Sequence, residues 1–328
     1  MNMRSVTVMA YANIALLKYW GKRCEKLFLP TRPSLSLNLE ALKTITTIAI
    51  SSTDSITIRN NPDIKNASIT TIQFLSLFRK TYGINHSFAI SSYNTFPTSA
   101  GLSSSSSGFA ALAYGLAALC SLNLSQKELS ILARQGSGSA CRSIPGGFAV
   151  WEKGSLDDGS DSYAHQLFNE QYWPELRMLI AITSTKSKKI SSRDGMNITK
   201  ETSRCYKTWA HLGEARLKTM IDALSKKDIA KLGQEMETDW QEFHDIMLSA
   251  TPPLNYWNST SYRIIEIIQR LRQRGIACYC TTDAGPHVKI ICLKQSVPII
   301  RQTIQEKENV SIIESEIAGA PIIVGDKQ

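Results

Sequence analysis

Apolar and polar residues alternate along much of the first part of the chain, whereas later segments repeat apolar residues at helical spacing. Alternation at residues 34–52 and 55–59, with many β-branched side chains, predicts strands that form a β-meander. Residues 69–82 place apolar side chains three positions apart and end before Gly83, which predicts a helix. The same criteria predict strands at residues 6–10, 88–93, 148–151 and 178–183.

Helical spacing dominates the second part of the chain. Residues 198–248 are largely helical in pattern, and residues 262–274 predict a further helix. The change from a β-rich to a helical pattern near residues 183–195 predicts two domains, residues 1–187 and 188–328. In the tail we expect strands at residues 277–282, 288–293 and 310–314, with a helix at residues 297–307.

Composition narrows the class of protein. The 328 residues are 43% hydrophobic, which suffices for packed cores, and the net charge of +9 suggests an anionic partner. The chain has no long basic tail and no run of interleaved basic and aromatic residues, so we do not expect nucleic acid. Seven irregularly spaced cysteines, with no signal-peptide core and no span-length apolar run, predict a reduced cytoplasmic protein that does not enter a membrane.

The serine-glycine run from Gly101 to Gly108 is the most informative local feature. It leads into residues 109–120, an alanine-rich stretch that favours a helix. Small residues let backbone N–H groups approach a phosphate, and a helix that follows adds its unpaired donors and dipole. The run lacks the lysine of a Walker A loop, and a flexible serine-rich loop is the simpler explanation when the run is read alone.

Residues 97–105 match P-x-x-x-G-L-x-S-S, and this pattern resembles the phosphate loop of GHMP kinases. The resemblance implies that the loop binds the phosphates of ATP together with Mg²⁺, whose protein ligands the sequence does not identify. The residues that it assigns to the ATP phosphates are Gly101, Leu102, Ser104 and Ser105, with Ser103, Ser106 and Ser107 beside them.

Residues 13–22 narrow the resemblance to one branch of that superfamily. They match N-I-A-x-x-K-Y-W-G-K, which is similar to the N-terminal signature of diphosphomevalonate decarboxylases. Lone lysines are usually solvated, but this polar set stands among apolar and aromatic residues. The resemblance implies that Lys18 lies at the reacting centre and that Asn13, Tyr19 and Lys22 bind the substrate.

Three later segments match the same family in the same order. Residues 136–143 resemble G-S-G-S-A-x-R-S, where Ser137 and Ser139 would hold the diphosphate and Arg142 the carboxylate. An arginine can hold a carboxylate through two parallel hydrogen bonds. The segment ending at Met196 resembles K-x-x-S-S-x-x-G-M, which puts Ser192 near the transferred phosphoryl group and Lys188 or Lys189 near ATP. Finally, D-A-G-P at residues 283–286 makes Asp283 the expected catalytic base.

The family resemblance implies a two-domain α/β (α+β) GHMP kinase fold. Its N-terminal half is similar to ribosomal protein S5, its C-terminal half is ferredoxin-like, and the active site lies in the cleft between them. The implied enzyme is a homodimeric carboxy-lyase of the mevalonate route to isoprenoids. It uses ATP to phosphorylate the 3-hydroxyl of mevalonate 5-diphosphate, and yields isopentenyl diphosphate, carbon dioxide, ADP and phosphate.

One segment departs from the family pattern. After Pro30, relatives usually carry an asparagine before a short strand, whereas this chain has Arg32 and Pro33. The departure leaves open a decarboxylase that acts on the 5-monophosphate. A GHMP kinase that stops after phosphorylation and a basic binding protein with a decayed site are further alternatives, which the combination of Lys18, Arg142 and Asp283 disfavours.

Overall fold

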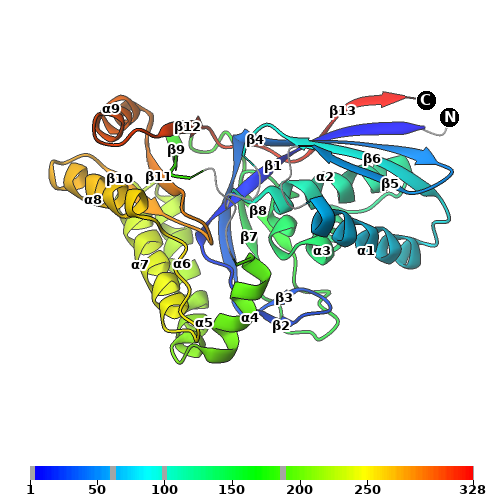
Figure 1. The fold of residues 1–328 in the computed structure, drawn as a ribbon, viewed down its shortest axis with the longest axis horizontal. Helices are drawn as coiled ribbons and strands as arrows, with labels where there is room; N and C mark the ends of the chain where they lie inside the picture. The colour runs from blue at the N-terminus through cyan, green and yellow to red at the C-terminus, as the bar shows by residue number, and fades with distance from the viewer. Residues whose placement is uncertain (1–3, 60–63, 98–101, 185–189, 328) are drawn as a thin grey trace.

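The computed structural model of the chain describes residues 4–59, 64–97, 102–184 and 190–327. Two sheets lie side by side in Figure 1, each with helices against it. The sheet of the N-terminal half has the strand order β13-β1-β4-β6-β5, and β7 extends it by pairing with β4 and β8. Its strands are β1 (Ser5–Leu17), β4 (Ser34–Ser51), β5 (Ser55–Arg59), β6 (Ser87–Asn94), β7 (Phe148–Trp151), β8 (Ala164–Phe168) and β13 (Ile322–Lys327).

The expected β-meander is wrong in its pairing. The two predicted strands, β4 and β5, are present, but β5 does not pair with β4 in the described sheet. Instead β5 runs parallel to β6, and β6 lies between them because it pairs antiparallel with β4. The helix predicted between β5 and β6 makes this crossover, as a parallel connection requires.

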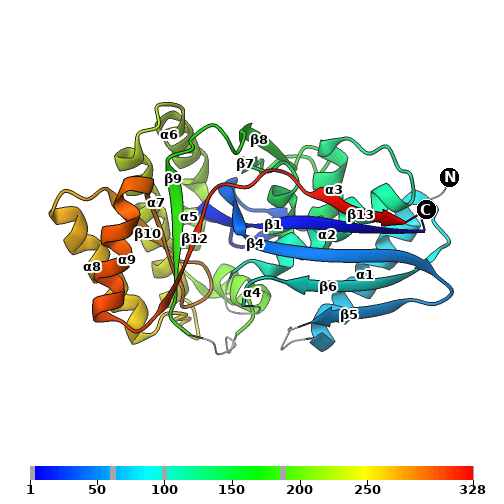
Figure 2. The same cartoon turned by 90° about the horizontal axis from the view of Figure 1, so that it is seen from above.

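Helices cover one face of this sheet, as Figures 1 and 2 show from two directions. The buried side chains of Val6, Val8 and Ile48 pack there against helical residues that include Phe78 and Leu116. Ser125 and Glu128 have the spacing of a capping box in the sequence, and the structure confirms it, because Ser125 accepts a hydrogen bond from the backbone N–H of Glu128. The helical segments of this half are α1 (Ile64–Tyr82), α2 (Ser104–Leu119), α3 (Gln126–Gly136) and the 3-10 helix η1 (Gly138–Ser143).

The second sheet has four strands in the order β10-β11-β9-β12, all antiparallel to their neighbours. Alternate residues of β9 enter different cores: Leu179 packs with α8 and α9, whereas Met178 and Ile180 pack with α6 and α7. The strands are β9 (Leu176–Ile182), β10 (Cys278–Thr281), β11 (Val288–Leu293) and β12 (Ser311–Ser315). The helices are α4 (Ser192–Thr202), α5 (Tyr206–His211), α6 (Gly213–Ser225), α7 (Ile229–Leu248), α8 (Ser259–Gln273) and α9 (Val297–Lys307), with the 3-10 turn η2 (Lys294–Ser296) before α9.

Chain segments cross between the two halves. β9 precedes the predicted boundary after residue 187, yet it pairs with β11 and β12. In the opposite sense, β13 at the end of the chain returns to pair with β1, and both termini lie together in Figure 2. The division into residues 1–187 and 188–328 stays a prediction. No helix in the described ranges is both long enough and apolar enough to cross a membrane.

A buried ion pair fastens the two halves together. Arg32, which precedes β4, donates from Nη2 to Oδ1 of Asp239 on α7 at 2.8 Å, and both side chains are almost wholly buried. The guanidinium also lies 4.0 Å from the ring of Trp209 on α5. The short antiparallel ribbon of β2 (Lys22–Cys24) and β3 (Leu29–Pro30) precedes Arg32 in the chain. Arg32 therefore belongs to the junction between the halves.

Arg32→Met tests this role of the junction. We expect it to lower the free energy of unfolding by about 3 kcal/mol, because it leaves a buried carboxylate with one cation fewer. Arg274→Met removes an exposed arginine and is the control, with a change of no more than about 0.5 kcal/mol. Urea titration of both variants measures the difference. Equal losses in the two variants would contradict the assigned role.

Candidate active site

A cavity of about 1000 Å³ lies between the two halves. Its wall combines the end of β1, the start of α2, η1, the start of α4 and the turn after β10, so segments far apart in sequence meet there. Cavities at the junction of two domains are common sites for small ligands. The chemistry of the wall then decides which ligand fits.

An ion pair joins the two halves at the floor of this cavity. Lys18 directly follows β1, and its ammonium donates to Oδ1 of Asp283 at 2.8 Å and to the carbonyl of Ala15 at 2.8 Å. The main chain of Lys18 is held as well, because its N–H donates to the buried Asp239 at 2.7 Å. Both Lys18 and Asp283 line the cavity. The lysine is therefore fixed at its backbone and at its tip.

A second ammonium holds the same carboxylate. Nζ of Lys289 on β11 lies 3.1 Å from Oδ2 of Asp283. Burial by itself would raise the pKa of Asp283, but Lys18 and Lys289 together hold this pKa well below its usual range. Asp283 is consequently an anion at neutral pH.

Arg142 presents a guanidinium to the cavity from η1. Its Nε and Nη2 donate to Oδ1 of Asn13 at 3.2 and 3.0 Å, and its Nη1 donates to Oγ of Ser34 at 2.5 Å. Asn13 is fixed in turn, because its amide donates to the carbonyl of Ser139 and to the hydroxyl of Ser143. Asn13 thus lies behind Arg142 and orients it, and its predicted contact with substrate stays a prediction.

The serine-rich loop enters α2 at the opposite side of the cavity. Ser103 has a left-handed backbone, with φ of 57°, that turns the chain into the helix. The first turn of α2 carries no acidic side chain, so its N–H groups and dipole favour an anion. Two hydroxyl contacts join this turn to the η1 region: Ser137 donates to Ser105 at 3.3 Å, and Ser106 lies 2.7 Å from Ser139.

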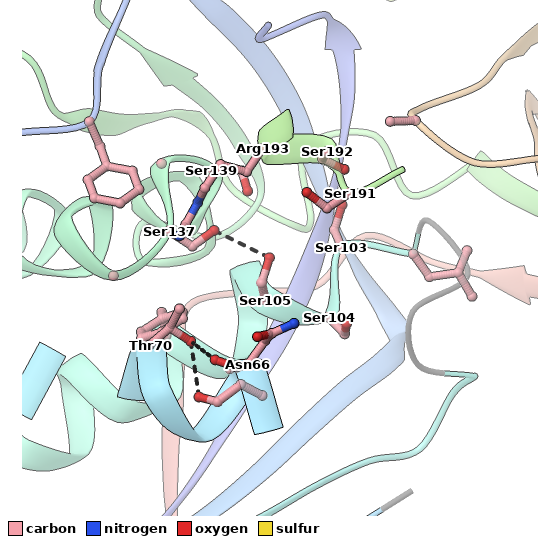
Figure 3. Close-up of a pocket in the computed structure, with 18 of the residues that line it drawn as sticks. Asn66, Thr70, Ser103, Ser104, Ser105, Ser137, Ser139, Ser191, Ser192 and Arg193 are labelled. Carbon is pink, nitrogen blue, oxygen red and sulfur yellow. Dashed lines mark hydrogen bonds between the residues drawn. The ribbon is translucent and has the colours of Figure 1, made fainter. Parts of the chain in front are cut away.

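Figure 3 shows the serines of three segments around one space. Ser104 and Ser105 come from α2, Ser137 and Ser139 from the η1 region, and Ser192 begins α4 beside the exposed Arg193. So many hydroxyl groups at a helix N-terminus, with an arginine opposite, form a surface that can bind several phosphate oxygens.

Tyr19 and Lys22 extend the polar wall. The buried hydroxyl of Tyr19 has no hydrogen-bond partner among the described residues, and burial raises the pKa of this phenol. A neutral O–H that faces a cavity without a partner is suited to donate to a ligand oxygen. The ammonium of Lys22 donates to Glu25 at 2.5 Å and lies 5.0 Å from the ring of Phe28, at the same side of the cavity.

Two family models together match almost the whole chain. The diphosphomevalonate decarboxylase-like N-terminal domain matches residues 10–164, and the mevalonate 5-diphosphate decarboxylase C-terminal domain matches residues 178–320. Diphosphomevalonate decarboxylase of Danio rerio is 38% identical, over 99% of this chain and 85% of its own. The chain belongs to the diphosphomevalonate decarboxylase family. The Saccharomyces cerevisiae relative of the same name is 36% identical, over 90% of this chain and 80% of its own.

Solved structures of the family share the fold. Mevalonate diphosphate decarboxylase of Enterococcus faecalis matches with a TM-score of 0.90 and 37% identity, over 98% of this chain and 99% of that one. The Staphylococcus aureus enzyme matches with a TM-score of 0.91 and 36% identity, over 98% of both chains. Another neighbour, MDDEF in complex with MVAPP, AMPPCP and magnesium, has a TM-score of 0.89 and 37% identity, over 98% and 99%. The predicted two-domain GHMP kinase fold is confirmed.

Most of the residues predicted from the family motifs line one cavity. These are Lys18, Tyr19, Lys22, Leu102, Ser103, Ser104, Ser105, Ser137, Ser139, Arg142, Ser192 and Asp283. Gly101, Lys188 and Lys189 lie outside the described residues. The structure adds Asn66 and Thr70 of α1 and Arg193 of α4 to the cavity wall, and behind the wall it adds Asp239, which contacts Lys18, and Lys289, which contacts Asp283. Of these added residues, only Arg193 could have been predicted from the sequence, because it lies inside a family motif.

The departure at Arg32 and Pro33 does not alter the described wall of the diphosphomevalonate decarboxylase cavity. Arg32 points away from it, towards Asp239 and Trp209, and neither Arg32 nor Pro33 is among the residues that line it. The departure from the family pattern at Arg32 therefore lies outside the described cavity wall. Its guanidinium is drawn to a buried carboxylate in the other half of the molecule.

Gly138 leaves room for the aromatic rings of Tyr19 and Trp151. A Cβ at this position would lie 2.7 Å from the hydroxyl of Tyr19 and 3.2 Å from the ring of Trp151, and these two rings pack 4.6 Å apart. We expect Gly138→Ala to lower the free energy of unfolding by about 1–3 kcal/mol, as overpacking does. The matched control is Gly108→Ala in α2, where a Cβ meets nothing within 4 Å. It should be neutral or stabilise by about 0.5–1 kcal/mol. Urea titration would contradict the assignment if both variants were equally stable.

Proposed function

We propose that the protein catalyses the ATP-dependent decarboxylation of mevalonate 5-diphosphate to isopentenyl diphosphate. The observation that carries this proposal is the ion pair of Asp283 with Lys18 in a cavity that Arg142 and the start of α2 also line. One cavity thereby combines a fixed carboxylate, a carboxylate-binding guanidinium and a phosphate-binding helix terminus. Family membership supports the same reaction.

In the first step the 3-hydroxyl of the substrate attacks the γ-phosphorus of ATP. The new O–P bond forms as the bond to ADP breaks, and the hydroxyl proton passes to Asp283. A carboxylate with a depressed pKa is a weak base, but the hydroxyl becomes strongly acidic as its oxygen bonds to phosphorus. Lys18 would stabilise the charge near the transferred group, since phosphoryl transfer depends on alignment and charge neutralisation.

The second step removes the new phosphate group and the carboxylate. The bond from C3 to the phosphorylated oxygen breaks and inorganic phosphate leaves with the electron pair. The bond between C2 and the carboxylate carbon then supplies two electrons to the C2–C3 double bond, and carbon dioxide is released. Arg142 would hold the carboxylate by two hydrogen bonds, and its support by Asn13 and Ser34 keeps the guanidinium in place.

The nucleotide would lie between α2 and α1. Ser103, Ser104 and Ser105 are proposed to contact the ATP phosphates, with Gly101, Leu102, Lys188 and Lys189 as predicted neighbours. Asn66 and Thr70 line the same cavity further along and would receive the nucleoside. The described residues contain no cluster of three or more His, Cys, Asp or Glu that could hold a metal ion. Mg²⁺ fits this site through the ATP phosphates, its usual ligands, with serine hydroxyls nearby, and it would neutralise phosphate charge.

A decarboxylase of mevalonate 5-diphosphate differs from one of the 5-monophosphate in that its cavity must bind a second substrate phosphate. Tyr19, Lys22, Ser137, Ser139 and Arg193 offer more donors on one side of the cavity than a monophosphate would need. This supports the diphosphate, with the 5-monophosphate as the alternative. Ser192 would lie near the transferred phosphoryl group.

The setting of the reaction follows from the resemblance. We propose a cytoplasmic homodimer that works in isoprenoid biosynthesis, a branch of lipid metabolism. All seven cysteines are free thiols, which fits a reducing compartment. Light scattering on the purified protein and cell fractionation would test the dimer and its location.

Parallel assays with mevalonate 5-diphosphate and 5-phosphate test the activity. With ATP and Mg²⁺, we expect the diphosphate to yield carbon dioxide, ADP and phosphate in equal amounts, and at least tenfold faster than the monophosphate. Trapped carbon dioxide and a coupled ADP assay provide the readouts. ADP without carbon dioxide would indicate a kinase, faster turnover of the monophosphate would favour the alternative, and no turnover of either would reject the proposal.

Substitution of Asp283 tests the assigned base. We expect Asp283→Ala and Asp283→Asn to reduce kcat by at least about 10³-fold, within the range of a lost general base combined with lost charge stabilisation. The affinity for ATP should change less than threefold, because the nucleotide is bound mainly by the serine loops. Fluorescence titration with an ATP analogue measures binding separately. Near-normal turnover in either variant would defeat the assignment.

A further inference from the structure

Lys289 is a fully buried lysine that no motif of the sequence singles out. It lies in the middle of β11, where Val288 and Ile290 point into the apolar core of α8 and α9. Because side chains alternate along a strand, Lys289 points to the opposite face. The exposed fraction of its side chain is 0%. A buried ammonium is costly unless a partner compensates its charge, so its partner is informative.

One partner is the carboxylate of Asp283. Nζ of Lys289 lies 3.1 Å from Oδ2 of Asp283, whereas Nζ of Lys18 lies 2.8 Å from Oδ1. The two lysines come from different sheets and hold different oxygens. Lys18 lines the cavity, but Lys289 does not, so Lys289 contacts the carboxylate from behind. Two ammonium groups on opposite oxygens fix both the position and the rotation of the carboxylate plane.

We propose that Lys289 is a positioning residue for the phosphoryl-transfer step, which orients the Asp283 carboxylate towards the substrate hydroxyl and keeps it ionised. The inference rests on the proposed function and extends it by one residue. Lys289 does not touch the substrate. It acts through Asp283, and its effect must therefore appear in the properties of that carboxylate.

The charges around the carboxylate define how it should titrate. Lys18, at the end of β1, and Lys289, on β11, are in contact with it, and Arg142 of η1 adds a more distant positive charge. Asp239 of α7 adds a negative charge behind Lys18. His287 follows β10 and is neutral, since burial lowers its pKa to about 3 and its Nδ1 accepts from the backbone N–H of residue 183. Cations dominate, so the carboxylate stays ionised.

Removal of Lys289 should change the pH dependence in a defined direction. An opposite charge within about 4–6 Å lowers a carboxyl pKa by about 1–3 units, so its loss raises the pKa by a similar amount. The active form of Asp283 is the ionised one. In Lys289→Met, the acidic limb of the rate profile should therefore move to higher pH by about 1–3 units. Arginine retains the charge, so Lys289→Arg should leave the limb within about half a unit of wild type.

The experiment measures the single-turnover rate of ADP formation from pH 9 down to the lowest pH at which wild type and variants remain folded, with mevalonate 5-diphosphate, ATP and Mg²⁺. Lys294→Met is the control, because it removes an exposed lysine just beyond the same strand without touching the carboxylate. We expect Lys289→Met to be at least tenfold slower than wild type at pH 8, with its limb displaced. The control should match wild type at every pH. ATP affinity should be unchanged in all variants.

The outcomes separate this inference from the proposed function. If wild type forms no ADP and releases no carbon dioxide, the proposed function fails. If wild type is active and Lys289→Met follows the wild-type pH profile, or if Lys289→Arg shifts as far as Lys289→Met, the role of Lys289 is rejected. A purely structural lysine would lower the melting temperature and the amount of active protein without moving the limb.

A measurement without any substitution at residue 289 covers the case in which its variants do not fold. Nitrogen-15 NMR of the lysine side chains should show slowly exchanging ammonium groups that include those of Lys18 and Lys289. Both should change in Asp283→Asn, because each loses its charged partner. A response of only one ammonium would overturn the inference.

Discussion

One carboxylate between two ammonium groups organises this molecule. Asp283 follows a strand of the second sheet, Lys18 follows the first strand of the chain, and Lys289 lies on the strand beside the aspartate. An isolated buried charge would cost several kcal/mol, so each of these groups requires the others. The contact can form only when both halves are folded and docked. The proposed reacting centre is thus a product of the junction, and neither half contains it alone.

A second layer of buried polar contacts supports that centre. Asp239 holds the main chain of Lys18 and also binds Arg32, so the lysine and the junction share one carboxylate. Asn13 orients Arg142 in a similar way, because its Oδ1 accepts a hydrogen bond from the guanidinium. Groups that are already oriented need little reorganisation when substrate binds, and this is how fixed charges lower a barrier efficiently.

Phosphate recognition relies on a different kind of group. At the start of α2 and of η1 the donors are hydroxyl groups and backbone N–H groups, while Arg193 is an exposed cation and the buried ammonium of Lys22 is paired with Glu25. Neutral donors can surround a polyanion closely without repelling one another. The cavity therefore separates the two proposed tasks, with hydroxyl-rich loops for the phosphates and buried charges for the reacting atoms.

The sequence by itself determined the local structure and the chemical inventory. Period-two alternation located β4 and β5, the Ser125 capping box marked the start of α3, and the ordered motifs identified Lys18, Arg142 and Asp283 as one set. These features depend on neighbouring residues or on family-specific spacing, both of which are visible in a linear chain. The short strands β2, β3 and β8 and the returning β13 were not predicted, because a few residues carry too little periodicity.

Only the tertiary structure decided which distant residues meet. Alternation could place Lys289 on one face of a strand, but it could not reveal that this face abuts Asp283 rather than water. In the same way, Arg32 could be noticed as a departure but not assigned to Asp239, which lies 207 residues away in sequence. The pairing of strands was also decided by the tertiary structure, because β5 pairs with β6 and not with β4. Contacts of this kind depend on how whole sheets and helix layers pack, and the spacing of apolar residues within one segment does not predict them.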